Sequence, residues 1–183
     1  MTEFVSLDGV MEAPGGEPGY PHSGWVGGYF TPELGAYKEQ EQLAADILLI
    51  GRVTYESFYG AWPQRDGAMA DKINTMTKYV VSTTLGSSDW HDTTVIDSAV
   101  ESTVAALKAS DGGPILVAGS RTLVQSLLAA DLVDELNLQV FPLLLGSGRH
   151  LYPETVDTHP LRLVSSQRLA NGVLLQTYGR ADG

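Results

Sequence analysis

Two short stretches with the same order of residues constrain this sequence most strongly. Residues 47–51 (ILLIG) and residues 115–119 (ILVAG) each consist of an apolar run that ends in a glycine, and each is followed by a helix start. Consecutive apolar residues before a turn are typical of a strand that is buried on both faces of a parallel sheet. The sequence therefore predicts two strand–turn–helix units in one chain.

Each of these units is expected to bind an anion. The first backbone N–H groups of a helix have no partner within the helix, and the helix dipole places positive charge at the same end. A glycine turn that leads into a helix start therefore favours anions, phosphate above all. Two such units in one small chain suggest that they hold the two ends of one dinucleotide.

Composition excludes several classes of protein. The chain has 183 residues, which favours a single domain over 1–183. It has no cysteine, which excludes disulfides, thiolate metal sites and cysteine nucleophiles. The net charge of −11 argues against nucleic acid as a partner. We expect no metal site, no membrane span and no signal peptide, and therefore a cytoplasmic location.

The order of the expected elements predicts an α/β fold. Strands and helices alternate over the first two thirds of the chain, whereas residues 134–141, 161–169 and 173–179 are expected to be strands only. Ser98 and Glu101 match a capping box and predict a helix that runs to about Ala109. The pattern predicts three layers, α/β/α, with a mostly parallel central sheet and antiparallel C-terminal strands.

The strand expected at residues 78–84 becomes polar where it ends. Ser82, Thr83 and Thr84 carry three consecutive hydroxyls. Ligands of parallel α/β sheets bind beyond the carboxyl ends of the strands, so these hydroxyls are well placed for a phosphate or a ribose. Ordinary turn chemistry explains the same residues equally well.

Five motifs in order resemble the dihydrofolate reductase-like family. They are residues 6–11 (SLDGVM), 50–56 (IGRVTYE), 78–84, 118–123 (AGSRTL) and 144–148 (LLGSG), and together they cover nearly the whole chain. The phrase at residues 128–136 (LAADLVDEL) is similar to the reductase domain of the bifunctional riboflavin-biosynthesis deaminase-reductase.

The resemblance implies an NADPH-binding reductase and assigns its cofactor contacts. The adenosine and pyrophosphate side falls to Gly51, Arg52 and Thr54, with Arg52 on the 2′-phosphate. The adenine–ribose pocket falls to Ser82, Thr83 and Thr84. The pyrophosphate falls to Gly119, Ser120, Arg121, Thr122 and Leu123. Ser120 stands where the family usually has a second glycine, and we expect it to donate its N–H and to cap the following helix.

The substrate side resembles the family less closely. Dihydrofolate reductases carry a carboxylate on the first helix, and the corresponding position here falls near Gly35. The candidate substrate contacts are therefore Asp8, Trp25 and Tyr37. Asp8 is equally well explained as an Asp-Gly turn residue, and the two aromatic residues as core.

The sequence thus favours an NADPH-dependent reductase of a small heterocycle that is pterin-like or pyrimidine-like. One alternative is a non-catalytic nucleotide-binding module of the same fold. Another is the 5-amino-6-(5-phosphoribosylamino)uracil reductase of riboflavin biosynthesis. The apolar strands at residues 136–141 and 174–175 suggest a homodimer.

Overall fold

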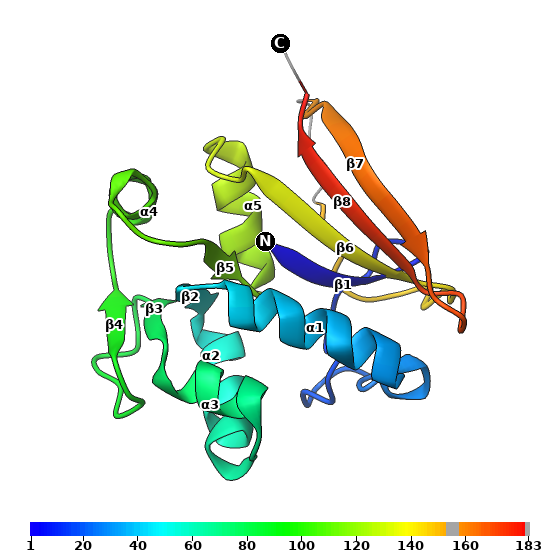
Figure 1. Ribbon diagram of the computed structural model, residues 1–183, viewed down its shortest axis with the longest axis horizontal. Coiled ribbons are helices and arrows are strands. Elements are labelled where there is room, and N and C mark those ends of the chain that lie inside the picture. The colour runs from blue at the N-terminus through cyan, green and yellow to red at the C-terminus, as the bar shows by residue number, and fades with distance from the viewer. Residues whose placement is uncertain (153–157, 182–183) are drawn as a thin grey trace. The chain divides into compact units, whose positions relative to one another are not determined.

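The computed structural model describes residues 1–152 and 158–181 of the chain (Figure 1). Contacts divide it into two compact units, Met1–Gly35 with Val133–Gly183, and Ala36–Leu132. Residues 182–183, at the end of the predicted domain 1–183, lie outside the described residues, and the single domain stays a prediction.

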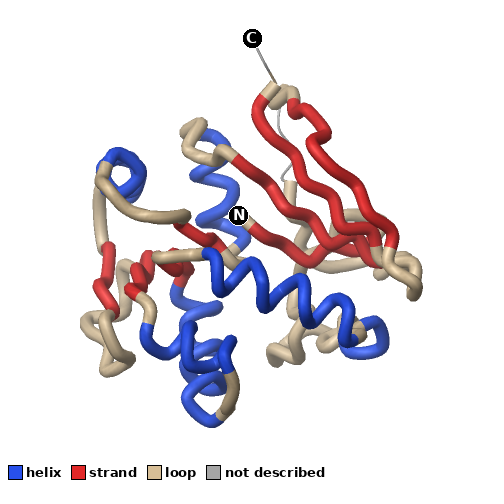
Figure 2. Tube along the Cα trace, in the orientation of Figure 1, coloured by secondary structure: helices blue, strands red, loops and turns tan. Residues whose placement is uncertain are grey.

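The unit Ala36–Leu132 alternates helices and strands (Figure 2). Its strands form one sheet in the order β4-β3-β2-β5, and every neighbouring pair is parallel. Helix α1 starts just before the unit. In chain order the elements are α1 (Pro32–Ala44), β2 (Ile47–Gly51), α2 (Arg52–Ala61), η2 (Trp62–Gln64), α3 (Ala68–Thr75), β3 (Thr77–Val81), β4 (Thr93–Ile96), α4 (Val100–Ala109), β5 (Ile115–Val117) and α5 (Arg121–Ala129).

Strand β2 is the centre of this sheet and is buried on both faces. Leu48, Leu49 and Ile50 are fully buried, as the consecutive apolar run predicts. Helix α2 packs against β2 and β3, and α5 packs against β2. Burying each of these large apolar side chains contributes about 1.5–3 kcal/mol, which fixes β2 and the turn that follows it.

The unit Met1–Gly35 with Val133–Gly183 contains the antiparallel strands. It consists of β1 (Thr2–Ser6), η1 (Gly27–Tyr29), β6 (Glu135–Phe141), β7 (Leu161–Arg168) and β8 (Leu174–Arg180). The sheet order is β1-β6-β8-β7, in which β1 pairs parallel with β6 and the other pairs are antiparallel. The predicted class is therefore confirmed as a mixed α/β fold with a parallel sheet and antiparallel C-terminal strands.

Both strands proposed for dimer contact are already paired on each side. Strand β6 lies between β1 and β8, and β8 lies between β6 and β7. Strand β7 is an edge strand, and all of its residues are exposed. The homodimer stays a prediction.

The capping box expected at Ser98 is wrong. Helix α4 starts at Val100, and its N-cap residue is Ala99 in the left-handed region at φ 51°. The Ser98 hydroxyl donates instead to the carboxylate of Asp97 at 2.9 Å. The sequence matched the motif, but the backbone enters the helix one residue later than the motif requires.

No helix among residues 1–152 and 158–181 is both long and apolar enough to cross a membrane.

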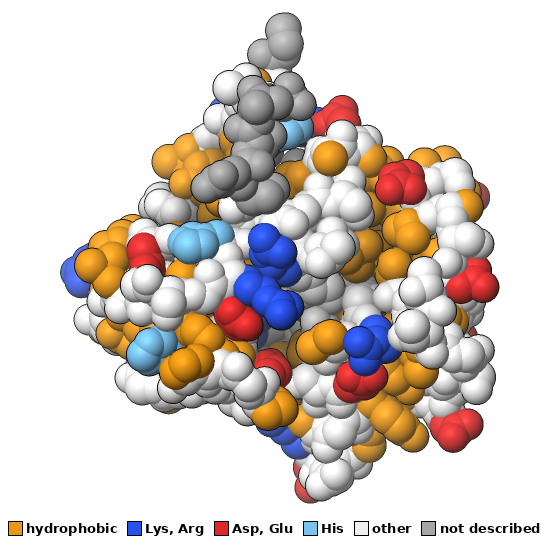
Figure 3. Space-filling model, turned by 180° about the vertical axis from the view of Figure 1, so that it is seen from behind, with side chains coloured by type: hydrophobic (Ala, Val, Ile, Leu, Met, Phe, Trp, Pro, Cys, Tyr) orange, Lys and Arg blue, Asp and Glu red, His pale blue; other side chains and the backbone are white. Residues whose placement is uncertain are grey.

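On the face drawn in Figure 3, the Lys and Arg side chains form small groups with acidic side chains beside them.

Lys78 is a buried charge that the sequence does not reveal. It lies on β3 with 0% of its surface exposed. Its ammonium donates to the backbone carbonyls of Asn74 (3.1 Å), Met76 (2.6 Å) and His91 (3.0 Å), and it lies 4.7 Å from the centre of the Trp90 ring. Burial lowers the pKa of the amine to about 8, while the charge of Asp92 acts in the opposite direction.

We predict that Lys78→Met destabilises the protein by about 3 kcal/mol, because carbonyls left without a donor in the interior each cost about 1–3 kcal/mol. Urea unfolding measures this loss. Lys108→Met, on the exposed end of α4, is the matched control and is expected to change the free energy of unfolding by less than about 1 kcal/mol. A Lys78→Met protein as stable as the wild type would contradict this role for the buried amine.

Candidate functional site

The register of the parallel sheet brings three polar chain segments to one edge. Gly51 on β2 pairs with Val81 on β3, and Val81 pairs with Ile96 on β4. Neighbouring strands lie about 4.8 Å apart, so these three strand ends are level with one another. Arg52, Ser82 and Asp97 are the residues that directly follow them in the chain.

The order of the strands in the sheet changes direction at β2. The connection through α2 and α3 leads to β3 on one side of β2, whereas β5 lies on the other side. In parallel α/β sheets such a switch of direction opens a crevice beyond the carboxyl ends of the strands, where ligands bind. In this sheet the switch lies between β2 and β5, at whose ends the two glycine turns lie.

A serine hydroxyl joins the two glycine turns. The Gly51 N–H donates to Ser120 Oγ at 2.6 Å, and Ser120 Oγ donates to Thr54 Oγ1 at 2.8 Å. The expectation that Ser120 caps helix α5 with its side chain is wrong, because α5 has no side-chain cap. The hydroxyl turns away from its own helix toward α2.

Both glycines are required by close approach of the chain. A Cβ at Gly51 would lie 3.2 Å from the Ser120 Oγ, and a Cβ at Gly119 would lie 3.3 Å from the Thr54 Oγ1. Gly119 also has φ +63°, a conformation that favours glycine. The two turns therefore pack against each other through main chain and small side chains only.

The chemistry of this edge fits an anionic group such as a diphosphate. Helices α2 and α5 both begin here, so two helix dipoles direct positive charge to the same place. The backbone N–H groups of Thr122 and Leu123 have no acceptor among the residues that the structure describes. The donors at these helix starts suit phosphate oxygens.

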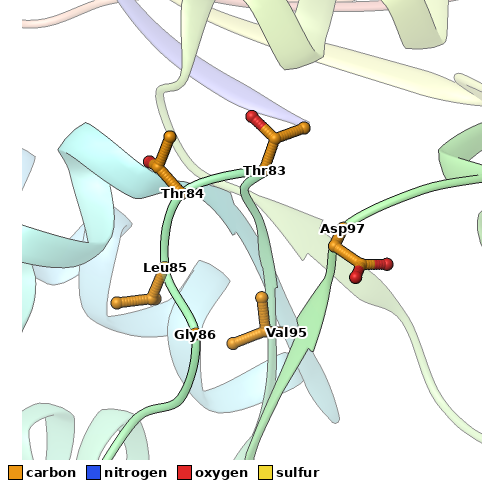
Figure 4. Close-up of a pocket in the computed structure, with 6 residues that line it drawn as sticks. All are labelled: Thr83, Thr84, Leu85, Gly86, Val95 and Asp97. Atoms are coloured by element: carbon orange, nitrogen blue, oxygen red, sulfur yellow. The ribbon is translucent and has the colours of Figure 1, made fainter.

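A pocket of about 230 Å³ lies at the ends of β3 and β4 (Figure 4). Exposed Thr83 and Thr84 line it from the loop after β3, and Asp97 lines it from the end of β4. Ser82 is buried and accepts the N–H groups of Thr84 and Leu85, at 3.1 and 2.9 Å, so its hydroxyl shapes the loop. Of the three predicted residues, two line the pocket and one supports their loop.

Arg52 is ion-paired. Its guanidinium lies 2.7 Å from the carboxylate of Glu56, one turn further along α2, and both side chains are about half exposed. The helix dipole disfavours a cation at the first position of a helix. A bound phosphate would attract the guanidinium and make its position favourable. Arg52 is thus available for a phosphate only in competition with Glu56.

Asp8 lies in a turn of the other unit. Its Oδ1 accepts the Ser6 hydroxyl at 2.6 Å and the Leu145 N–H at 3.1 Å, and its Oδ2 accepts the Gly146 N–H at 2.8 Å. The bond from Ser6 and the two backbone N–H groups hold the pKa of Asp8 at about 2, while desolvation acts in the opposite direction. This carboxylate is ionised at neutral pH and cannot supply a proton.

Trp25 is part of the core of the same unit. It is 9% exposed, its indole N–H donates to the carbonyl of Glu12 at 2.8 Å, and its ring meets Phe141 edge to face. Tyr37 is half-buried on α1, in the other unit. Contacts of Asp8, Trp25 and Tyr37 with a substrate stay predictions.

Two residues of the site escaped the sequence predictions. Asp97 is the first residue after β4, so the rule that placed Ser82–Thr84 at the end of β3 points to it as well. Glu56 follows Arg52 by four residues on one helix, a spacing that indicates an ion pair.

Among residues 1–152 and 158–181, no three His, Asp or Glu side chains form a group that could hold a metal ion.

The parallel sheet, the antiparallel C-terminal strands and the paired glycine turns define the fold of the dihydrofolate reductase-like proteins. The profile of the RibD C-terminal domain matches residues 1–175. The chain belongs to this family. Two uncharacterized proteins of Bacillus subtilis strain 168 are similar along their length: YyaP is 26% identical over 95% of this chain and 90% of its own, and YwjB is 28% identical over 97% and 94%.

Solved structures share the fold at low sequence identity. A Shewanella sp. PV-4 protein ascribed to riboflavin biosynthesis has a TM-score of 0.76 and 21% identity, with 99% of this chain and 97% of the other covered. The Enterococcus faecalis dihydrofolate reductase, complexed with NADP(H), has a TM-score of 0.65 and 17% identity over 99% and 95%. A Thermotoga maritima deaminase/5-amino-6-(5-phosphoribosylamino)uracil reductase has a TM-score of 0.67 and 16% identity over 98% of this chain and 55% of its own.

We predict that the carboxylate of Asp8 stabilises the protein above about pH 4 and that this contribution is lost as the pH falls toward 2, because its folded pKa lies below the ordinary 3.8. Urea unfolding of the wild type and of Asp8→Asn from pH 7 to pH 2 measures the difference. The gap between them should close in this window. Asp111→Asn, in an exposed turn, is the control, and a gap independent of pH would contradict the prediction.

We predict that Glu56→Gln tightens NADPH binding about 2- to 5-fold, because exposed ion pairs contribute about 0.2–1 kcal/mol and the variant frees Arg52 from its competitor. Binding of NADH should stay unchanged, since it lacks the 2′-phosphate. Titration calorimetry measures both affinities. Glu101→Gln on α4 is the control, and an equal effect on both cofactors would rule out competition at Arg52.

Proposed function

We propose that this protein is an NADPH-dependent reductase of a small heterocyclic substrate. The observation that carries the proposal is the pair of glycine turns, joined through Ser120, at the point where β2 and β5 end. Two helix starts and a lined pocket lie along the same edge of the sheet. This arrangement supports a ligand with one anionic centre and one nucleoside end.

In this proposal, different residues hold different parts of the cofactor. The diphosphate is held by the N–H groups at the start of α5 and by Thr54 on α2. The adenosine end lies in the pocket of Thr83, Thr84 and Asp97, and Arg52 faces the 2′-phosphate at its rim. This assignment follows the row of strand ends, in which each group is one strand away from the next.

When bound, NADPH would supply a hydride to an unsaturated carbon of the substrate and would be released as NADP⁺, and the proton that completes the reduction would come from solvent. The chain's own contribution is to bind and orient. Asp8 remains ionised and Gly35 carries no side chain, so neither residue supplies that proton.

The names of proteins that share the fold support the choice of substrate class. The solved reductases are named for dihydrofolate and for a phosphoribosylaminouracil, which are both nitrogen heterocycles. A pterin-like or pyrimidine-like ring is therefore the class to test, with the riboflavin-pathway uracil as one member. A cytoplasmic enzyme of this kind meets both NADPH and such rings.

The second candidate is a nucleotide-binding module without turnover. It is favoured by the glycine at position 35, where a reductase of folates needs an acid, and by the fully engaged carboxylate of Asp8. Oxidation of NADPH, followed by its absorbance, distinguishes the two candidates when dihydropterins and aminouracils are offered in turn. Turnover of one of them supports the reductase, and binding without turnover of any supports the module.

We predict that the wild type binds NADPH at micromolar concentration and NADH at least 10-fold more weakly, and that Arg52→Ala removes the preference. A guanidinium–phosphate pair contributes about 1.5–3 kcal/mol, which corresponds to about 10- to 100-fold. Titration of the tryptophan fluorescence measures the four affinities. Arg65→Ala, beside Trp62, is the control. An unchanged preference in Arg52→Ala would show that Arg52 does not contact the 2′-phosphate.

A further inference from the structure

Ser120 occupies a conformation that costs free energy. Its φ of 71° and ψ of 64° lie in the left-handed region, where a residue with a Cβ is disfavoured relative to glycine. A strained residue persists where the surrounding structure fixes it, and such residues cluster at functional sites. The hydroxyl of Ser120 makes no capping hydrogen bond to α5 that would offset this cost. Its two hydrogen bonds are both made to the other glycine turn and its helix.

The geometry gives each of these hydrogen bonds a direction. A backbone N–H only donates, so the Ser120 Oγ accepts from Gly51. A serine hydroxyl has one proton, and this proton goes to the Thr54 Oγ1 at 2.8 Å. Thr54 is therefore an acceptor toward Ser120, and its own proton must point elsewhere. That proton meets no acceptor among the residues described in the structure.

We propose that Ser120 is a positioning residue that orients the Thr54 hydroxyl as a hydrogen-bond donor to a diphosphate oxygen of the cofactor. The proposal rests on the proposed function. It deepens that function by adding an ordered relay, from the Gly51 N–H through Ser120 to Thr54 and then to the anion. An anionic oxygen accepts only, so a donor whose proton already points outward binds it without first breaking another bond.

The alternative is that Ser120 only ties the two turns together. In that case its loss changes stability and moves the start of both helices, whatever side chain stands at position 54. In the relay, by contrast, Ser120 acts through the Thr54 proton alone. Its effect on binding must therefore vanish when Thr54 has no hydroxyl, which a double-mutant cycle measures.

The experiment measures the dissociation constant of NADPH by fluorescence titration for the wild type, Ser120→Ala, Thr54→Val and the double variant. We expect Thr54→Val to weaken binding about 10-fold, as for a lost hydrogen bond to a charged group. We expect Ser120→Ala to weaken it about 3- to 10-fold alone and to have no further effect beside Thr54→Val. Thr54→Ser keeps the hydroxyl and should restore both the affinity and its dependence on Ser120.

Ser120→Gly separates binding from stability. It removes the hydroxyl and also relieves the left-handed strain, so it should unfold at a higher urea concentration than Ser120→Ala. The relay predicts the same loss of NADPH affinity in both variants despite their different stabilities.

Each other outcome overturns the proposal. Two results would reject the relay and leave the proposed function standing. One is an unchanged dissociation constant in Ser120→Ala. The other is a Ser120→Ala substitution that weakens binding equally with and without the Thr54 hydroxyl. A wild-type protein that binds neither NADPH nor inorganic pyrophosphate rejects both the relay and the proposed function.

Discussion

The burial of strand β2 is the constraint on which the candidate site depends. Leu48, Leu49 and Ile50 are inaccessible to solvent, and the strand pairs with β3 on one side and β5 on the other. The pairing fixes the register, because Leu49 lies opposite Tyr79 of β3 and opposite Val117 of β5. In this register Gly51, which ends β2, and Gly119, two residues after the end of β5, follow their paired residues by the same number of positions.

The proposed site offers backbone and hydroxyl groups more than charge. An acidic chain with a net charge of −11 has few cations to place near a phosphate, and its motif arginine is paired with Glu56. Helix starts supply positive potential without a charged side chain. In the proposed relay, Ser120 directs the Thr54 hydroxyl and Thr54 is the donor to the anion. On this proposal, affinity depends on the geometry of the two turns.

The sequence alone predicted the fold class well. The apolar runs at residues 47–50 and 115–118 predicted buried parallel strands, and the alternating C-terminal segments predicted the antiparallel ones. The fully buried strand and the amphipathic helix each leave a periodic trace, so their type can be predicted without a structure. Thr83 and Thr84, which the rule for strand ends singled out, line the pocket, and their contact with a cofactor stays a prediction.

The details that escaped depend on side-chain direction, which sequence spacing does not encode. Ser120 bonds across to Gly51 because the left-handed backbone turns its side chain away from α5. Ser98 fails as a cap because the backbone enters α4 one residue later. Lys78 appears on a strand as an ordinary polar residue, and its burial depends on the carbonyls of Asn74, Met76 and His91.

The most direct test of the account is an amide NMR titration of the isotopically labelled protein with NADPH. The central claim is that the paired glycine turns and the adjoining strand ends form the cofactor site. It predicts that the largest shifts cluster at residues 51–54, 82–84 and 119–123. Shifts confined to other parts of the chain, or none at millimolar NADPH, would contradict it.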